Sequence, residues 1–244
     1  MIGGGSKGLG RACADSLAKE GANLVICSRN AENLDQTAKE IYSTYGVDVL
    51  PVAANLSRLE DIQTLIKATV DHFGRLDILV NNSGGPPAGR SADTTDEVWH
   101  QSIEMALMFF IRMSREAVPH MKQGKWGRIV NVLASSVYQP IDNLVTSGVT
   151  RMGAVAFAKS LADEVGRDNI LVNNVAPGYL LTDRMMHIFE TRSNETGANV
   201  EDLLQAHSVT IPVGRLGRPE ELGDLVTFLT SDKNTYTTGA TILV

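Results

Sequence analysis

A glycine-rich loop near the start of the chain has the residue types and spacing of a phosphate-binding turn. Its sequence reads Gly4-Gly5-Ser6-Lys7-Gly8-Leu9-Gly10. Glycine accepts a positive φ and lets another group approach the backbone closely. The helix-forming segment 11–20 follows, and a helix start presents free N–H groups and the positive end of its dipole. A pyrophosphate fits such a site, so the loop predicts nucleotide binding, with a flexible tail as the alternative.

Two cations are expected to meet beside this loop. In dinucleotide-binding folds an acidic residue ~20 residues further on bonds the ribose 2′-hydroxyl of NAD. This chain has Arg29 there instead, after Ser28 at the end of a predicted strand, and Lys7 lies in the loop itself. Arginine can bind a phosphate through two parallel hydrogen bonds. We therefore predict NADP(H) in preference to NAD(H), the alternative being two solvated surface charges.

The elements that must position these residues alternate along the chain. Strands are predicted at residues 23–28, 47–53, 76–80, 128–133, 170–175 and 240–244. Helices are predicted at residues 31–45, 58–73, 95–119, 149–165 and 219–229. Such alternation indicates an α/β fold: a single Rossmann-type, doubly wound parallel sheet with helices on both faces. No linker divides residues 1–244, so one domain is expected, and the missing strand before the loop suggests incomplete termini.

Composition narrows the possible partners. The net charge is −6, which provides no basic surface for nucleic acid or an anionic membrane. No apolar run approaches the ~18 residues that a membrane span requires. The two cysteines, Cys13 and Cys27, have neither disulfide-framework nor metal-ligand spacing. We expect a cytoplasmic protein with no metal, nucleic acid or membrane partner.

Several further motifs occur in order and cover essentially the whole chain. They are Asn81-Asn82-Ser83-Gly84, Gly127-Arg128-Ile129-Val130-Asn131, Val172-Asn173-Asn174-Val175-Ala176-Pro177-Gly178 and Gly214-Arg215-Leu216-Gly217-Arg218-Pro219-Glu220-Glu221. Together with the spacing Gly4-x-x-x-Gly8-x-Gly10, they resemble the short-chain dehydrogenase/reductase family. The resemblance implies that residues 179–212 form a substrate lid. It also implies a homotetramer or homodimer that associates through helices near 95–118 and 149–165.

The resemblance also implies further cofactor contacts. Asn55 and Leu56 match the family's adenine position, where aspartate is usual. Asn82, Ser83 and Gly84 match the loop beside the adenosine ribose, and Pro177, Gly178 and Thr182 match the segment that holds the nicotinamide carboxamide. For Ser83 and Thr182, capping of a helix or turn is the alternative role.

The family's catalytic residues are replaced. They are an Asn, a Ser and a Tyr-x-x-x-Lys pair, and ungapped alignment places Ala106, Ala134, Ser147 and Arg151 at these positions. A serine hydroxyl is a far weaker acid than a phenol, whereas arginine can still bond ribose hydroxyls and supply positive charge. Ser147 and Arg151 are therefore candidate catalytic residues, and Arg151 also a cofactor contact; a helix N-cap is the alternative for Ser147.

Neighbouring residues offer other proton donors. Tyr138 is the nearest phenol, with a packed loop aromatic as its alternative role, and Ser135 could replace the missing serine by a one-residue shift. His187, within residues 179–212, could act as an acid or base near neutral pH, although a solvated histidine is the simpler interpretation.

Two functions remain open on this basis. The first is an NADP-dependent oxidoreductase, most similar to the 3-oxoacyl-carrier-protein reductase branch. It would move hydride between nicotinamide and a small carbonyl or alcohol substrate, with a non-standard proton donor. The second is an inactive NADP-binding homologue that serves as a sensor or partner subunit. The intact loop suits both, whereas the replaced catalytic residues distinguish them.

Overall fold

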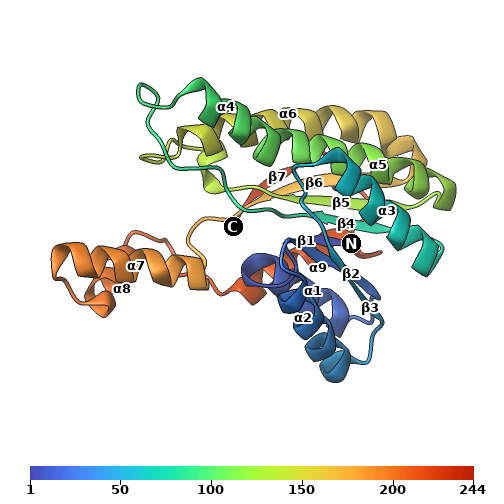
Figure 1. Cartoon of the computed structure of the whole chain (residues 1–244), viewed down its shortest axis with the longest axis horizontal. Helices are drawn as coiled ribbons and strands as arrows, with labels where there is room; N and C mark the ends of the chain where they lie inside the picture. The colour runs from blue at the N-terminus through green and yellow to red at the C-terminus, as the bar shows by residue number, and fades with distance from the viewer.

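The computed structural model describes all residues 1–244 and is built on one parallel sheet (Figure 1). Its seven strands lie in the order β3-β2-β1-β4-β5-β6-β7. Their bounds are β1 Ile2–Gly3, β2 Leu24–Ser28, β3 Val49–Ala53, β4 Ile78–Asn81, β5 Gly127–Val132, β6 Ile170–Ala176 and β7 Thr241–Leu243. The strand order reverses between β1 and β4. This confirms the predicted doubly wound α/β fold.

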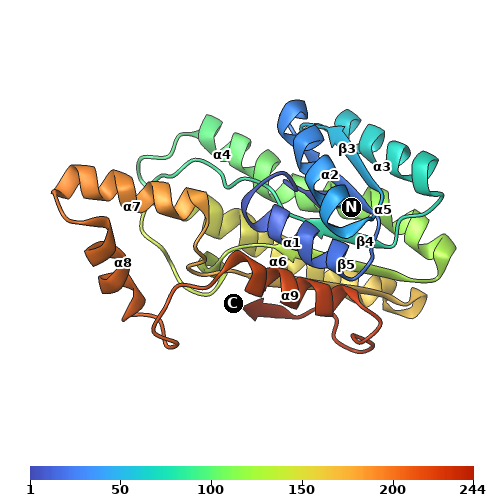
Figure 2. The same ribbon diagram turned by 90° about the horizontal axis from the view of Figure 1, so that it is seen from below.

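Helices cover both faces of the sheet (Figures 1 and 2). One face carries α1 Gly8–Lys19, α2 Ala31–Tyr45 and α9 Pro219–Thr230. The other carries α3 Leu59–Phe73, α4 Asp96–Ile103, α5 Phe109–Gly124 and α6 Val145–Val165. Two single turns of 3₁₀ helix, Ser135–Val137 and Gly166–Asp168, flank α6.

Successive strand residues supply the two halves of the core. Val25 and Leu79 pack beneath the helices of the α3 side, while their neighbours Ile26 and Val80 pack beneath those of the α1 side. Both faces of each strand are therefore apolar, as expected for a parallel sheet covered on both sides. The bounds of β2 to β7 agree with the sequence-based prediction to within two residues, whereas the strand β1 before the loop, taken as missing from the sequence, is present as Ile2–Gly3.

The helix predicted from Thr95 towards Pro119 is continuous, but its end near Pro119 is wrong and its middle is not regular α-helix. A π-helical turn, Glu104–Met108, separates α4 from α5, and α5 continues to Gly124 with Pro119 inside it. A proline within a helix costs ~3 kcal/mol because it removes one backbone hydrogen bond and crowds the preceding turn. The same helix buries Phe110, Met113 and Met121 completely, and each such side chain contributes about 1.5–3 kcal/mol. Burial outweighs the defect.

The start predicted for the helix at residue 149 is also wrong. Helix α6 begins at Val145, so Ser147 lies inside its first turn and is not an N-cap. Thr146 fixes this start, since its hydroxyl donates a 2.8 Å hydrogen bond to the Pro87 carbonyl oxygen. The first turn contains β-branched residues and a glycine, which have low helix propensity, so propensity did not predict a helix there.

A row of buried side-chain hydrogen bonds crosses four strands. The Asn81 amide donates to Asn131 Oδ1 at 2.9 Å, and the Asn131 amide donates to Asn174 Oδ1 at 2.8 Å. The Asn174 amide in turn donates to Thr241 Oγ1 at 3.0 Å. These bonds join β4, β5, β6 and β7 near the carboxyl ends of the strands, where the sheet carries the candidate site.

Residues 179–212 form an arm of two helices that projects from the body (Figures 1 and 2). Its helices are α7 Asp183–Thr196 and α8 Val200–Ser208. His207 of α8 packs edge-on against Tyr179 and Phe189, with ring centroids 3.9 and 5.7 Å away. No helix of the chain combines the length and apolarity needed to cross a bilayer.

Candidate active site

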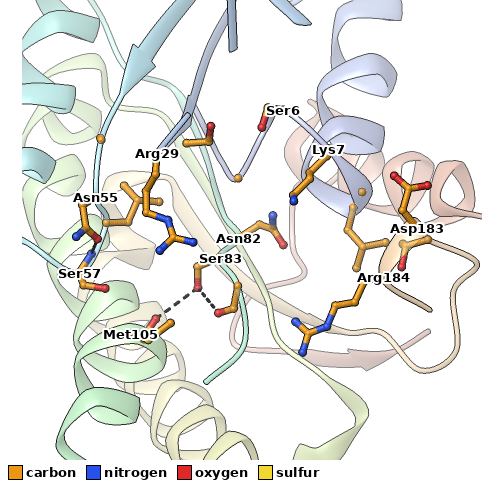
Figure 3. A pocket seen from close by; sticks show the side chains of 18 of the residues that line it. Ser6, Lys7, Arg29, Asn55, Ser57, Asn82, Ser83, Met105, Asp183 and Arg184 are labelled. Carbon is orange, nitrogen blue, oxygen red and sulfur yellow. Dashed lines mark hydrogen bonds between the residues drawn. The ribbon is translucent and has the colours of Figure 1, made fainter. Parts of the chain in front are cut away.

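A cleft of about 710 Å³ opens at the carboxyl ends of the strands, where the strand order reverses (Figure 3). Ligands of open α/β sheets bind at such switch points. The residues lining the cleft come from the glycine loop, the ends of β2, β3 and β4, the π turn and the start of α7. They are Gly4, Ser6, Lys7, Gly8, Leu9, Ser28, Arg29, Ala54, Asn55, Leu56, Ser57, Asn82, Ser83, Gly84, Met105, Thr182, Asp183, Arg184 and His187.

The glycine loop has a backbone that side chains would disrupt. Gly4 and Gly8 have φ values of +59° and +55°. A Cβ on Gly10 would lie 2.2 Å from the Gly4 carbonyl oxygen, so the loop and helix α1 touch through this glycine. The Asn82 amide holds the loop from below through a 3.0 Å bond to the Gly3 carbonyl oxygen. This open turn at a helix start fits a pyrophosphate, as the sequence predicted.

Cations in the cleft have no carboxylate partner. The arginines that form ion pairs are Arg11, Arg58, Arg75, Arg112, Arg115, Arg215 and Arg218. Lys7, Arg29 and Arg184 form no ion pair. All three side chains extend into the cleft (Figure 3). Asp183 is the one acidic residue of the lining. The cleft is therefore electropositive and suited to a polyanionic ligand.

Asn55 is arranged so that part of its amide remains free. Its backbone N–H donates to Asp61 Oδ2 at 2.8 Å, and its Oδ1 accepts a 3.1 Å bond from the Ser57 N–H. The Nδ2 group makes no hydrogen bond within the chain and is available to a ligand in the cleft. Leu56 follows in the lining and provides apolar surface.

Ser83 and Thr182 have structural roles as well as cleft positions. The Ser83 hydroxyl lies 3.4 Å from the Met105 carbonyl oxygen of the π turn, for which it is a donor. Thr182 is the N-cap of α7, with its Oγ1 accepting from the Met185 N–H at 3.3 Å. Capping by Thr182, left open by the sequence, is thus observed, and contact with a cofactor stays a prediction for both residues.

Four predicted cofactor residues, Gly10, Arg151, Pro177 and Gly178, are not among those that line the cleft. Gly10 is buried in α1 beneath the loop. Pro177 accepts a 2.9 Å bond from the Ser135 N–H, and the Gly178 N–H donates to the Val244 carbonyl oxygen at 2.8 Å. These residues shape the cleft through the backbone around it.

Ser147 and Arg151 form a buried pair on α6. Arg151 Nε donates to Ser147 Oγ at 3.1 Å, and its Nη1 donates to the Val132 carbonyl oxygen at 3.1 Å. The Nη2 group makes no hydrogen bond within the chain. Only 6% of Arg151 is exposed, and burial, followed by the charge of Arg184, lowers its pKa to about 10. The guanidinium remains charged at neutral pH.

Neither alternative proton donor is hydrogen-bonded to this pair, although the turn that Ser135 begins packs against α6. Tyr138 is 53% exposed, and its hydroxyl donates to the Thr241 carbonyl oxygen at the end of the sheet. Ser135 begins a 3₁₀ turn, held there by the bond from its N–H to Pro177. Neither residue is among those that line the cleft, and the same holds for Ser147 and Arg151, which lie buried behind it.

Several lining residues were missed by the sequence analysis, and Arg184 is the most consequential. It lies in the first turn of α7, two residues after the Thr182 cap, and reaches into the cleft (Figure 3). The first turn of a helix favours acidic residues, so an arginine there is unusual. This was the sequence signal by which Arg184 could have been found. His187, one turn later, was already a candidate from the sequence; it lines the cleft, with its Nδ1 3.9 Å from Glu190 Oε2.

Comparison with known proteins agrees with this geometry. Residues 4–244 match the family described as enoyl-(acyl carrier protein) reductase. The 3-oxoacyl-[acyl-carrier-protein] reductase FabG of Aquifex aeolicus is 33% identical over 246 residues, covering 100% of this chain and 94% of that protein.

Two solved structures are similar throughout. L-sorbose reductase from Gluconobacter frateurii, complexed with NADPH and L-sorbose, has a TM-score of 0.96 and 32% identity, covering 100% of this chain and 93% of that one. YwfH, an NADPH-dependent reductase involved in bacilysin biosynthesis, has a TM-score of 0.95 and 27% identity, covering 100% and 94%. The chain belongs to the short-chain dehydrogenase/reductase family of oxidoreductases.

Proposed function

We propose that the protein is an NADP(H)-dependent reductase of small carbonyl compounds, with a proton donor that differs from the family's tyrosine. The observation that carries this proposal is the electropositive cleft, with its phosphate loop and the Ser147–Arg151 pair on the adjoining helix. FabG, L-sorbose reductase and YwfH are reductases; L-sorbose reductase was solved in complex with NADPH, and YwfH is NADPH-dependent.

The residues that would hold the cofactor divide along the cleft. The N–H groups at the start of α1 suit a pyrophosphate, and Lys7 and Arg29 suit a ribose 2′-phosphate. Asn55 and Ser83 offer polar groups for the adenosine end. When bound, NADPH supplies a hydride to the substrate carbon.

Ser147 is the donor that the hydrogen bonds favour. One lone pair of its Oγ accepts from the Arg151 guanidinium, which leaves the hydroxyl proton without an acceptor in the chain. That proton can pass to the oxygen of a reduced carbonyl, and the Arg151 charge stabilises the alkoxide left on serine until water reprotonates it. Tyr138, by contrast, already directs its proton to the Thr241 carbonyl oxygen.

A carbonyl panel with NADPH tests this function. We expect tight NADPH binding and oxidation of the cofactor with some carbonyls. Ser147→Ala should lower kcat by about 100-fold, the lower end of general acid contributions, without changing the affinity for NADPH. Tyr138→Phe is the matched control and should retain activity.

Three outcomes would contradict the proposal. Activity lost in Tyr138→Phe and kept in Ser147→Ala would move the donor to the loop. Tight NADPH binding with no oxidation by any carbonyl would favour an inactive nucleotide-binding homologue. Activity unaffected by either substitution would leave water as the donor.

We also propose that residues 179–212 act as the substrate lid and that the chain forms a homotetramer or homodimer. The arm borders the cleft through Thr182, Arg184 and His187, which supports the first. On α4 and α6, Ile103, Val149 and Met152 are 36%, 56% and 48% exposed, which supports association through these helices. A monomer in light scattering at micromolar concentration would contradict it.

A further inference from the structure

The guanidinium groups of Arg184 and Arg151, which come from different parts of the fold, both lie close to Gly85 beside the cleft. Gly85 follows β4, and a Cβ built on it would lie 3.6 Å from Arg184 Nη1 and 3.9 Å from Arg151 Nη2. Arg184 comes from the arm, whereas Arg151 comes from α6 in the body. Because residue 85 is glycine, no side chain separates the two groups.

The pair has positive charge and no internal counter-ion. Neither arginine belongs to an ion pair, and the Nη2 group of Arg151 makes no hydrogen bond within the chain. Two like charges this close repel each other, and Arg151 is 6% exposed, so little water screens them on that side. An oxyanion between them would remove the repulsion and complete the hydrogen bonding.

The phosphates of the cofactor have other partners. The loop and the start of α1 suit the pyrophosphate, Lys7 lies in that loop, and Arg29 follows β2. Arg151 and Arg184 are grouped at Gly85, which follows Ser83 and Gly84 in the chain, and Arg151 is bonded to Ser147. The arginine pair is thus adjacent to the candidate proton donor, where a substrate must lie.

We propose that Arg184 and Arg151 together bind a carboxylate of the substrate. The substrate class is then an oxo acid, a carbonyl compound whose carboxylate lies close enough to its reactive carbonyl to reach the arginine pair while Ser147 reaches the carbonyl oxygen. Arg184 offers a whole fork and Arg151 one unused nitrogen, which matches the two oxygens of a carboxylate. This assignment rests on the reductase function proposed above.

The first experiment measures turnover of 2-oxo and 3-oxo acids against their methyl esters, in which the negative charge is absent. The wild type should prefer the acids. Arg184→Gln should lower kcat/KM for an acid by about 10- to 100-fold, since a hydrogen bond to a charged group contributes about 1.5–3 kcal/mol. The change should fall on KM, leave the ester unaffected and leave the NADPH affinity within about twofold. Arg192→Gln, on the same helix outside the cleft, is the control.

The second experiment does not depend on turnover. Calorimetry in the presence of NADP⁺ should show that benzoate binds the wild type more tightly than benzamide does, and that Arg184→Gln removes the difference. Equal binding of the two probes, or benzoate binding unchanged in Arg184→Gln, would overturn the carboxylate site. Arg184→Gln that weakens NADPH itself and affects acid and ester equally would assign the arginine to a cofactor phosphate. Charge-selective benzoate binding without turnover of any acid would instead support the site and contradict the reductase function.

Discussion

Replacing Arg29 by alanine tests the cofactor preference most directly. Arg29 lies at the end of β2, is exposed, and belongs to no ion pair, so no internal bond is broken by the change. A charge-assisted hydrogen bond contributes about 1.5–3 kcal/mol, and the lower half of that range applies to an exposed side chain that water and salt can screen. Since 1.4 kcal/mol is tenfold in affinity, we expect NADPH to bind about 10- to 30-fold more weakly.

The assay is a calorimetric or fluorescence titration of NADPH and NADH at two salt concentrations. NADH affinity should not change in Arg29→Ala, because NADH lacks the 2′-phosphate, and the NADPH effect should shrink as salt rises. Arg29→Lys should fall between wild type and alanine, since it keeps the charge and loses the fork. Lys19→Ala, at the far end of α1, controls for a general loss of positive charge. Equal affinity for both nucleotides in the wild type, or equal weakening of both in Arg29→Ala, would refute the reasoning.

Three further changes test the loop, the sheet and a helix start. Gly10→Ala places a Cβ 2.2 Å from the Gly4 carbonyl oxygen, so the loop must shift. Calorimetry should then show NADPH binding weakened at least about tenfold, and an unchanged affinity would contradict the loop geometry. Asn131→Ala removes two buried hydrogen bonds and leaves Asn174 Oδ1 without a donor, whereas the Asn81 amide keeps its bond to Ser114 Oγ. Urea unfolding should therefore show a loss of about 1–3 kcal/mol, and an unchanged stability would mean that water replaces the asparagine. Hydrogen bonding from Arg215 lowers the pKa of Glu221 to about 2, so its stabilising effect is present above the ordinary pKa of 4.5 and lost as pH falls towards 2. The Tm difference between wild type and Glu221→Gln should therefore narrow over that interval, and a pH-independent difference would exclude the ion pair as its cause.

The fold and the nucleotide cleft could be predicted from local signals. Glycines mark the ends of helices, and the short apolar runs that follow them predict buried strands. The spacing of the first glycines predicts the phosphate loop. Arg29 and Asn55 were located because each follows a strand, and parallel strands bring their carboxyl ends to one edge of the sheet.

Other features depend on tertiary contacts that propensity does not encode. Helix α5 passes through Pro119 because its buried face outweighs the defect, and α6 starts early because Thr146 is held by Pro87. The bond between Ser147 and Arg151 requires that both lie in one helix at a spacing of four residues, which the late helix start obscured. Arg184 gave only a weak signal, since nothing in its neighbours along the chain reveals that it meets Arg151.

The two arginines of the proposed carboxylate site lie on different parts of the molecule, Arg184 on the two-helix arm and Arg151 in the body. His207 packs against Tyr179 and Phe189, and these contacts hold α8 to α7 and to the base of the arm. A ligand that bridges Arg184 on the arm and Arg151 in the body spans a joint (Figure 1). Ligand affinity and arm position are then thermodynamically linked: whatever holds the arm against the body tightens binding, and whatever swings it away promotes release. Product release would then depend on the position of the arm, because the product carboxylate that neutralises Arg184 and Arg151 contacts both the arm and the body.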